Sequence, residues 1–320
     1  MGIYNTRNIT LLIFRKGVIM NKILVPIDGS LTSQKAAEKA VAIAKLLNCE
    51  ITFITVVNLP SEDKYTYFGL DVQTAFRANR KVMLEEMIKQ ETKMLNVIVR
   101  NLNLGDLKIN KNVIVGVPSE QILKVSEDGY DLIIMGRKGF SNIERFFIGS
   151  VTQRVLTGAR CPVLVTNDEG EVNNMKKILV PIDGSSASVK AAEKAVEIAK
   201  EFNSSITFMT VLYELDTTRY FRYGIAIDLD LDKTKENLKE KENKMLNAVI
   251  AKLDLADLNY DKIICSGEAY EEILIEANKG SYDLIVMGRR GFSKIQRFFV
   301  GSVTQRVISE SPCPVLVVQE

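Results

Sequence analysis

The chain has 320 residues, of which 46% are hydrophobic and 26% are charged, and its 42 basic and 40 acidic side chains leave a formal net charge of +2. This balance is typical of a globular protein and gives no basic excess for binding nucleic acid or an anionic membrane. The sequence contains no histidine, which excludes imidazole catalysis and histidine-assisted metal sites.

Residues 1–19 precede the first regular element. Their apolar stretch, "NITLLIFRKGVIM", is shorter than the roughly 20 residues that span a bilayer, and it lacks the small-residue cleavage site of a secretory signal. The segment that starts at Met20 matches a later segment that starts at Met175. We therefore expect the first domain to begin at Met20 and residues 1–19 to be a dispensable N-terminal extension.

Strands and helices are predicted to alternate from Lys22 onward. The continuous apolar run at 22–28 predicts a strand buried on both faces of a parallel sheet, and further strands are predicted at 50–57, 109–116, 130–136 and 161–166. Between the strands, the sequence predicts helices at 33–47, about 81–102, 118–128 and 149–159, the first of them from helical spacing of alanine and aliphatic residues. This alternation predicts a doubly wound α/β domain with a five-stranded parallel sheet.

The whole pattern occurs twice in the chain. "KILVPIDGS" stands at 22–30 and unchanged at 177–185, and the regions 130–155 and 282–307 differ at only five positions. A period of about 150 residues is that of a whole domain, because solenoid repeats are only ~20–50 residues long. We therefore predict two tandem domains, domain 1 at 20–167 and domain 2 at 175–320, joined by the polar stretch "NDEGEVNN" at 167–174.

A glycine-rich loop follows the fourth strand of each domain, at the sheet edge where doubly wound folds bind ligands. In domain 1 it reads Gly136-x2-Gly139-x9-Gly149-Ser150, with Arg137 inside it. The glycines would let the backbone approach a ligand, and the helix that opens here would offer free N–H groups to an anion. The pattern predicts a phosphate cradle.

Two other interpretations of this loop need no ligand. The glycines could serve turn geometry alone, and Ser150 with Gln153 fits the S-x-x-Q capping box. Asp28 has a similar alternative, because Asp before Gly commonly caps the turn that follows. The residues by themselves leave these alternatives open.

Other nucleotide-binding motifs do not fit. The sequence has no GxxxxGK[ST] P-loop, and "PIDGS" after the first strand replaces the dinucleotide fingerprint GxGxxG. The SGGxDS loop of pyrophosphatase-type synthetases is also missing, as are the acidic pair and the phosphorylatable aspartate of receiver domains.

The chain resembles the universal stress proteins in their tandem two-domain form. The resemblance covers nearly all of residues 20–320 and depends on "VPIDGS", "VGVPSEQI", "SGEAYEEI" and the complete G-x2-G-x9-G-S signature in both halves. In that family the signature marks the members that bind ATP, on a fold like that of the adenine nucleotide alpha hydrolases. Many members have a histidine before the second glycine, where this chain has Lys138 and Arg290.

The resemblance implies a nucleotide site in each domain, with the aspartate on the adenosine, the valine near the adenine and the last four residues on the phosphates. In domain 1 the predicted residues are Pro26, Asp28, Ser30, Val56, Gly116, Met135, Gly136, Arg137, Gly139, Gly149, Ser150, Val151 and Thr152. In domain 2 they are Pro181, Asp183, Ser185, Val211, Gly267, Met287, Gly288, Arg289, Gly291, Gly301, Ser302, Val303 and Thr304.

The expected function is that of a stress-response regulator that binds one ATP per domain with similar affinity, with Mg²⁺ as an optional companion. Without histidine, an evident general base or a paired-carboxylate metal site, fast hydrolysis has little support. The alternatives are a slow ATPase on the same fold and an interaction module with vestigial sites. No catalytic and no metal-binding residues are predicted.

The expected partners beyond the nucleotide are protein surfaces. The resemblance implies that the final strands of the two domains pair edge to edge within one chain, and a homodimer is a further option. The four cysteines form no CxxC motif, so we expect free thiols in the cytoplasm, with Cys161 and Cys313 buried and structural. The segments 59–80 and 213–232, where the two repeats diverge most, could be plain surface loops, but we expect a mobile flap near the nucleotide or a partner surface there.

Overall fold

The structure is a computed structural model that describes residues 20–59, 70–139, 148–167, 175–213, 231–290 and 300–319. The chain divides into two compact units, with the boundary between Asp168 and Glu169. Within the described residues, no helix has both the length and the apolar character needed to cross a membrane.

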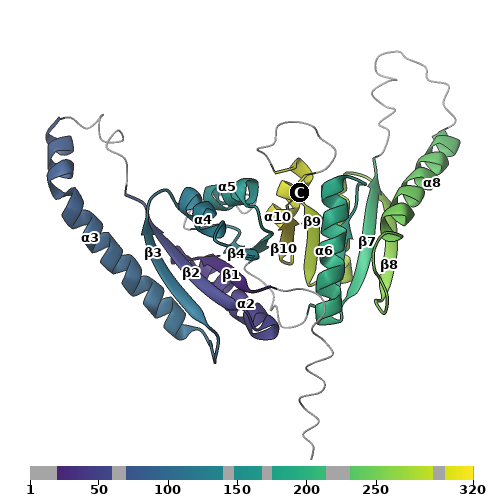
Figure 1. Cartoon of the computed structure of the whole chain (residues 1–320). Helices are drawn as coiled ribbons and strands as arrows, with labels where there is room; N and C mark the ends of the chain where they lie inside the picture. Colours follow the sequence, from purple (N-terminus) through teal and green to yellow (C-terminus); the bar gives the residue numbers. More distant parts are fainter. Residues whose placement is uncertain are drawn as a thin grey trace, which may run out of the picture. The chain divides into compact units, whose positions relative to one another are not determined.

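Domain 1 alternates strands and helices as the sequence predicts (Figure 1). The sheet has the strand order β3-β2-β1-β4-β5, and its neighbouring strands are parallel. The elements are β1 (Lys22–Pro26), α2 (Leu31–Leu47), β2 (Glu50–Val57), α3 (Leu70–Asn101), β3 (Ile109–Val115), α4 (Pro118–Ser126), β4 (Leu132–Gly136), α5 (Ser150–Gly158) and β5 (Val163–Thr166).

The strand order places a switch point beside β1. The chain runs outward from β1 through β2 to β3 in one direction, and then returns to β4 and β5 on the other side. Because crossovers between parallel strands are right-handed, the two directions put α2 and α3 on one face of the sheet and α4 and α5 on the other. Helix α4 indeed packs on α5, and α2 packs on β1 and β4. The loops at the carboxyl ends of β1 and β4 therefore meet at the position where such sheets bind ligands.

Small residues bring α2 close to the sheet. The helix begins at an N-cap, Ser30, whose side chain accepts a hydrogen bond from the Ser33 N–H at 3.3 Å. Its inner face consists largely of buried alanines, with Ala36, Ala37 and Ala40 fully buried. The start of the helix lies so near β4 that a Cβ at Gly136 would be 2.9 Å from the Thr32 backbone. Glycine at the end of β4 is thus needed for this close packing.

Domain 2 repeats the architecture, with parallel neighbours in the order β10-β9-β6-β7-β8. Its elements are β6 (Lys177–Pro181), α6 (Ser186–Phe202), β7 (Ser205–Leu212), α8 (Leu231–Ile250), β8 (Tyr260–Ser266), α9 (Ala269–Gly280), β9 (Leu284–Gly288), α10 (Ser302–Glu310) and β10 (Val315–Val318). The predicted fold, two doubly wound α/β domains in tandem, is confirmed.

The largest departure from the predicted elements is in α3. This helix begins at Leu70, whereas the sequence pattern predicts a start near residue 81. Residues 70–80 contain no proline or glycine to interrupt a helix, so the last part of the segment interpreted as a loop is helical. The rest of that segment, 60–69, lies outside the described residues, as do 214–230 of its counterpart, the extension 1–19 and most of the linker.

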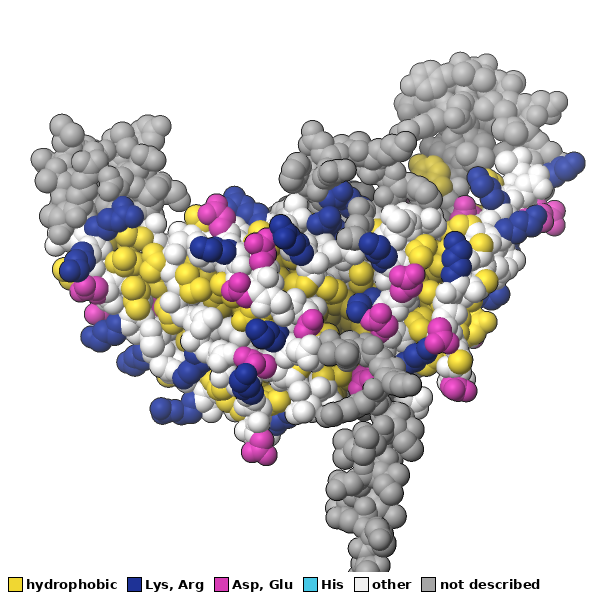
Figure 2. All heavy atoms as spheres, viewed as in Figure 1, with side chains coloured by type: hydrophobic (Ala, Val, Ile, Leu, Met, Phe, Trp, Pro, Cys, Tyr) yellow, Lys and Arg dark blue, Asp and Glu magenta, His cyan; other side chains and the backbone are white. Residues whose placement is uncertain are grey.

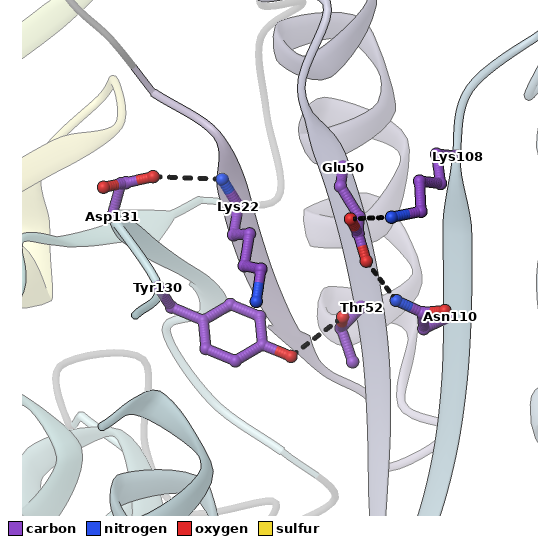
Figure 3. A network of polar contacts seen from close by, with 7 residues as sticks. All are labelled: Lys22, Glu50, Thr52, Lys108, Asn110, Tyr130 and Asp131. Atoms are coloured by element: carbon purple, nitrogen blue, oxygen red, sulfur yellow. Dashed lines mark hydrogen bonds and ion pairs between the residues drawn. The ribbon is translucent and has the colours of Figure 1, made fainter. Parts of the chain in front are cut away.

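A polar network links neighbouring strands of domain 1 at their amino ends, away from the loops at the carboxyl ends (Figure 3). Asp131 accepts hydrogen bonds from the backbone N–H groups of Asn21 and Lys22 at 2.7 and 3.0 Å, which ties the start of β4 to β1. Glu50 at the start of β2 pairs with Lys108, which precedes β3, at 2.6 Å. Side-chain hydrogen bonds and an ion pair therefore stabilise the amino ends of the strands, whereas the carboxyl ends carry the glycine-containing loops.

Candidate functional site

A cavity of about 350 Å³ lies at the carboxyl ends of β1, β2 and β4 in domain 1. It brings together residues that are up to 126 positions apart in the sequence, from Pro26 to Thr152. Of the residues predicted for the site, the cavity is lined by Pro26, Asp28, Val56, Met135, Gly136, Gly139, Gly149, Ser150, Val151 and Thr152.

The first turn of α5 forms one wall of the cavity. Gly149 is the N-cap of this helix and provides no side-chain cap, and its own N–H donates to the Arg137 carbonyl at 2.9 Å. Ser150 is the first helical residue. The capping-box interpretation is therefore wrong, because it needs Ser150 at the N-cap position. The backbone N–H groups of the first turn are those for which a helix has no internal acceptor, so this wall suits an anion.

The hydroxyl of Thr152 already has an acceptor within the protein. The Thr152 side chain is buried, and its hydroxyl donates to the Gly136 carbonyl at 3.0 Å. This bond joins the end of β4 to the first turn of α5. The hydroxyl therefore holds the two sides of the glycine loop together, and Thr152 lines the cavity with Ser150 and Val151.

Among the described lining residues of the domain 1 cavity, the cation is Lys138. Arg137, predicted from the sequence as a site residue, is not among the described lining residues, and its contact with a ligand stays a prediction. The Arg137 N–H donates to the Thr166 carbonyl at 3.1 Å, which extends the pairing of β4 with β5 by one residue. The same arrangement is found in domain 2, where Arg290 lines the cavity and Arg289 is not among the described lining residues.

Asp28 caps the turn after β1 and also lines the cavity, and its contact with a ligand stays a prediction. Its Oδ1 atom accepts hydrogen bonds from the N–H and the hydroxyl of Ser30 at 3.0 and 2.5 Å, which is the turn-capping role. The same side chain lines the cavity. Ser30 is buried, caps α2 and lies outside the described lining, so it orients Asp28. Direct contact of Ser30 with a ligand stays a prediction.

Gly116 and Gly267 have a structural role that the described contacts explain. They adopt φ values of +149° and +150°, which favour glycine, and they turn the chain from the third strand of each domain toward the next helix. A Cβ at Gly116 would lie 2.7 Å from the Gln121 side chain. Neither glycine is among the described lining residues of a cavity.

Domain 2 has a matching cavity of about 500 Å³. Its hydrogen bonds repeat those of domain 1: Gly301 N–H donates to the Arg289 carbonyl at 2.8 Å and the Thr304 hydroxyl to the Gly288 carbonyl at 3.0 Å. Of the predicted residues, the cavity is lined by Pro181, Asp183, Val211, Met287, Gly288, Gly301, Ser302, Val303 and Thr304. Ser185 caps α6 as Ser30 caps α2, and Gly291 lies outside the described residues.

Several lining residues were missed by the sequence analysis. In domain 1 they are Ile27, Ser33, Ile54, Thr55, Glu91, Pro118, Ile122 and Lys138. The apolar ones form a wall suited to a flat, poorly hydrated group, and Lys138 was signalled by its position before the second glycine. No sequence motif marks Glu91 as a site residue, since it lies in the middle of α3 and not in a loop at the end of a strand.

The charges that bear on the candidate site belong to a few residues of the cavity lining and not to a surface dominated by one sign of charge. Figure 2 shows Lys and Arg side chains interspersed with Asp and Glu over the face that it draws, so that neither sign dominates there. Within domain 1, Lys138 and the first turn of α5 form a positive part of the cavity lining, and Asp28 and Glu91 form a negative part. A ligand with an anionic end and a hydrogen-bond-donating end would match both.

Comparisons with known proteins agree with the motifs. The model of the universal stress protein family matches residues 20–167 and 174–319. Universal stress protein MJ0531 of Methanocaldococcus jannaschii is 34% identical over 148 residues, which are 46% of this chain and 84% of that protein. Universal stress protein YxiE of Bacillus subtilis is 34% identical over 145 residues, which are 45% of this chain and 98% of that protein.

A solved structure shares the fold of both halves. The crystal structure of a universal stress protein from Archaeoglobus fulgidus is similar with a TM-score of 0.65 at 24% identity, and the match covers 94% of this chain and 99% of that one. The resemblance inferred from the glycine signature is thereby confirmed. This chain belongs to the universal stress protein family and carries two family domains in tandem.

Proposed function

We propose that each domain binds one adenine nucleotide, ATP, and that the protein is a stress-response regulator. The observation that carries the proposal is the wall made by the uncapped first turn of α5, which faces a cavity with an apolar lining and is repeated at α10 in domain 2. Uncapped helix starts that face a cavity bind anions, and the apolar lining is suited to a base.

The residues divide between the parts of the nucleotide. The N–H groups of Ser150, Val151 and Thr152 would bind the phosphates, with Lys138 supplying a positive charge. Asp28 would accept hydrogen bonds from the ribose. The base would lie against apolar side chains such as Val56. In domain 2 the corresponding residues would act in the same way.

The experiment that tests this proposal is to release and identify the ligand of the purified chain. Mass spectrometry of the supernatant after denaturation is expected to find adenine nucleotide. Calorimetry with the nucleotide-free chain is expected to find two sites for ATP. An empty protein that produces no binding heat with ATP, ADP or AMP would contradict the proposal.

Hydrolysis and metal use are separate questions. Among the described residues, no group of three or more Asp, Glu or Cys side chains gathers to hold a metal ion. Mg²⁺ would therefore enter with the nucleotide and be held largely by its phosphates, as is usual for this ion. Release of phosphate from ATP, measured with and without Mg²⁺, separates the regulator from a slow ATPase. Retention of nucleotide through purification separates it from an interaction module with vestigial sites.

Assembly and location stay predictions from the sequence and the family resemblance. We propose that the two domains pair through their final strands, and that two chains can form a homodimer, which sedimentation equilibrium of the full chain tests. None of the four cysteines forms a disulfide in the structure, which is consistent with the proposed cytoplasmic location.

A further inference from the structure

Glu91 contributes a second carboxylate to the cavity of domain 1. It lies in the middle of α3, which packs on β2 and β3. Its side chain lines the cavity together with Asp28 and with Thr55 near the carboxyl end of β2. β2 and β4 flank β1 on opposite sides, so Glu91 and the first turn of α5 approach the cavity from opposite sides of β1.

The equivalent residue of domain 2 is placed differently. Glu242 occupies the same position in the repeated sequence "E-x-K-M-L-N". Its Oε2 atom accepts a hydrogen bond from the Thr210 hydroxyl at 3.5 Å, and it is not among the described residues that line the cavity there. In domain 1 the matching threonine, Thr55, donates to the Ile27 carbonyl at 3.0 Å instead. The two domains therefore differ in a charged group that their shared glycine signature does not reveal.

We propose that Glu91 is a nucleoside-contacting residue of domain 1, where its carboxylate accepts a hydrogen bond from a donor of the nucleoside, and that this contact makes domain 1 more selective than domain 2. The proposal rests on the proposed nucleotide binding and names a specificity determinant for it. An ionised carboxylate only accepts hydrogen bonds, so it favours an amine or hydroxyl at that position over a carbonyl or a hydrogen atom.

The charges around Glu91 agree with this role. Burial, and then the negative charge of Asp28, raise the pKa of the Glu91 carboxyl above its ordinary value. Glu91 is half-buried and Asp28 is exposed, so a ligand that brings hydrogen-bond donors to both carboxylates would offset their mutual repulsion and the partial desolvation of Glu91. Lys138, the cation among the described lining residues of this cavity, comes from the loop after β4, on the same side as α5.

The size of the cavity also supports greater selectivity in domain 1. The domain 1 cavity is smaller, about 350 Å³ against about 500 Å³ in domain 2. Ile54 and Pro118 line the former where Met209 and Ala269 line the latter. A smaller cavity with two carboxylates discriminates between nucleosides more strongly, because the wrong ligand leaves the half-buried Glu91 carboxylate without a hydrogen-bond donor.

The test compares analogues at one site at a time. Domain 1 is measured in a full chain that carries Gly301→Asp to empty domain 2, and domain 2 in a chain that carries Gly149→Asp. Calorimetry compares ATP with ITP, which has a carbonyl in place of the amine, and with 2′-deoxy-ATP and 3′-deoxy-ATP, which each lack one hydroxyl. At domain 1 we expect at least one analogue to bind about tenfold more weakly than ATP, the effect of one charge-assisted hydrogen bond.

The variants identify the residue responsible. The quantity compared is the dissociation constant of the analogue divided by that of ATP at domain 1. Glu91→Ala is expected to reduce this ratio from about 10 to about 2 or less. Glu91→Gln, which keeps an acceptor oxygen, is expected to give an intermediate ratio. The matched control, Glu242→Ala at domain 2, is expected to leave the ratios there unchanged. Thermal unfolding of each variant verifies that the chain remains folded.

Three results would overturn the proposal. The ratios at domain 1 could be unaffected by Glu91→Ala, or all three analogues could bind domain 1 as well as ATP does. Glu242→Ala could also change the ratios at domain 2 as much as Glu91→Ala does at domain 1. If ATP binds to neither single-site chain, the proposed nucleotide binding fails as well, and this result differs from ATP binding that is indifferent to Glu91.

Discussion

The carboxylate of Asp28 lies directly against Gly139: a Cβ at position 139 would be 2.4 Å from Asp28 Oδ2. No real Cβ approaches an oxygen so closely, so any other residue at 139 would displace Asp28. The carboxylate is held by Ser30 on its other oxygen, and this fixes the direction in which it points. The loop after β4 and the turn after β1 thus form one unit.

Gly139→Ala is expected to weaken ATP binding at domain 1 about tenfold, because it displaces Asp28 from the nucleoside. The flexible end of the carboxylate can move aside, so the free energy of unfolding should change by about 1 kcal/mol or less. Calorimetry with two resolved sites provides its own control, since domain 2 should be unaffected. An equal loss at both sites would indicate a general effect on folding.

Gly149→Asp and Gly301→Asp are each expected to empty one site. A carboxylate at the N-cap would accept hydrogen bonds from the first-turn N–H groups, which would then be lost to the phosphate. It would also repel a phosphate at a distance of roughly 4 Å, and the two effects together should weaken binding by several kcal/mol. Both glycines have φ near −60°, so Asp fits without backbone strain. Since glycine is already a tolerated N-cap residue, the variants should gain only about a few tenths of a kcal/mol in stability from the new cap. The double variant should bind no nucleotide while its melting temperature is unchanged or raised, and undiminished binding would refute the phosphate assignment.

Lys138→Ala is expected to weaken ATP binding at domain 1 by about three- to tenfold at low salt, because a positive charge near the phosphates is lost. The effect should decrease as salt is added and should be small for adenosine, which carries no phosphate. Arg137→Ala is the matched control and should leave affinity nearly unchanged. The opposite result, with Arg137 dominant, would contradict the placement of these two side chains.

Cys161 is expected to react slowly with alkylating reagents. Burial raises the pKa of its thiol to about 11, so at pH 8 the folded protein holds far less of the reactive thiolate than an ordinary cysteine does. Alkylation should be slower than in the unfolded chain on the order of 100-fold, and should accelerate as pH rises. Peptide mass spectrometry after timed iodoacetamide treatment measures both rates, and equal rates would show that the thiol is accessible and ordinary.

The sequence by itself determined the repeat, the order of strands and helices and the glycine-rich loop. These features are local: a strand buried on both faces must be apolar throughout, and the close approach of α2 to β4 at Gly136 tolerates no side chain. The parallel sheet then follows from the alternation of elements. The early start of α3 at Leu70 is missed because residues 59–80, where the two repeats diverge most, are interpreted as one loop segment.

Tertiary structure alone decided which side chains meet in the cavity. Arg137 and Lys138 are neighbours with the same charge, and only the path of the backbone after β4 determines which one lines the cavity. Likewise, nothing in the repeated "E-x-K-M-L-N" separates Glu91 from Glu242. Their difference arises because a side chain's direction depends on how its helix packs on the sheet, and that packing depends on residues far away in the sequence.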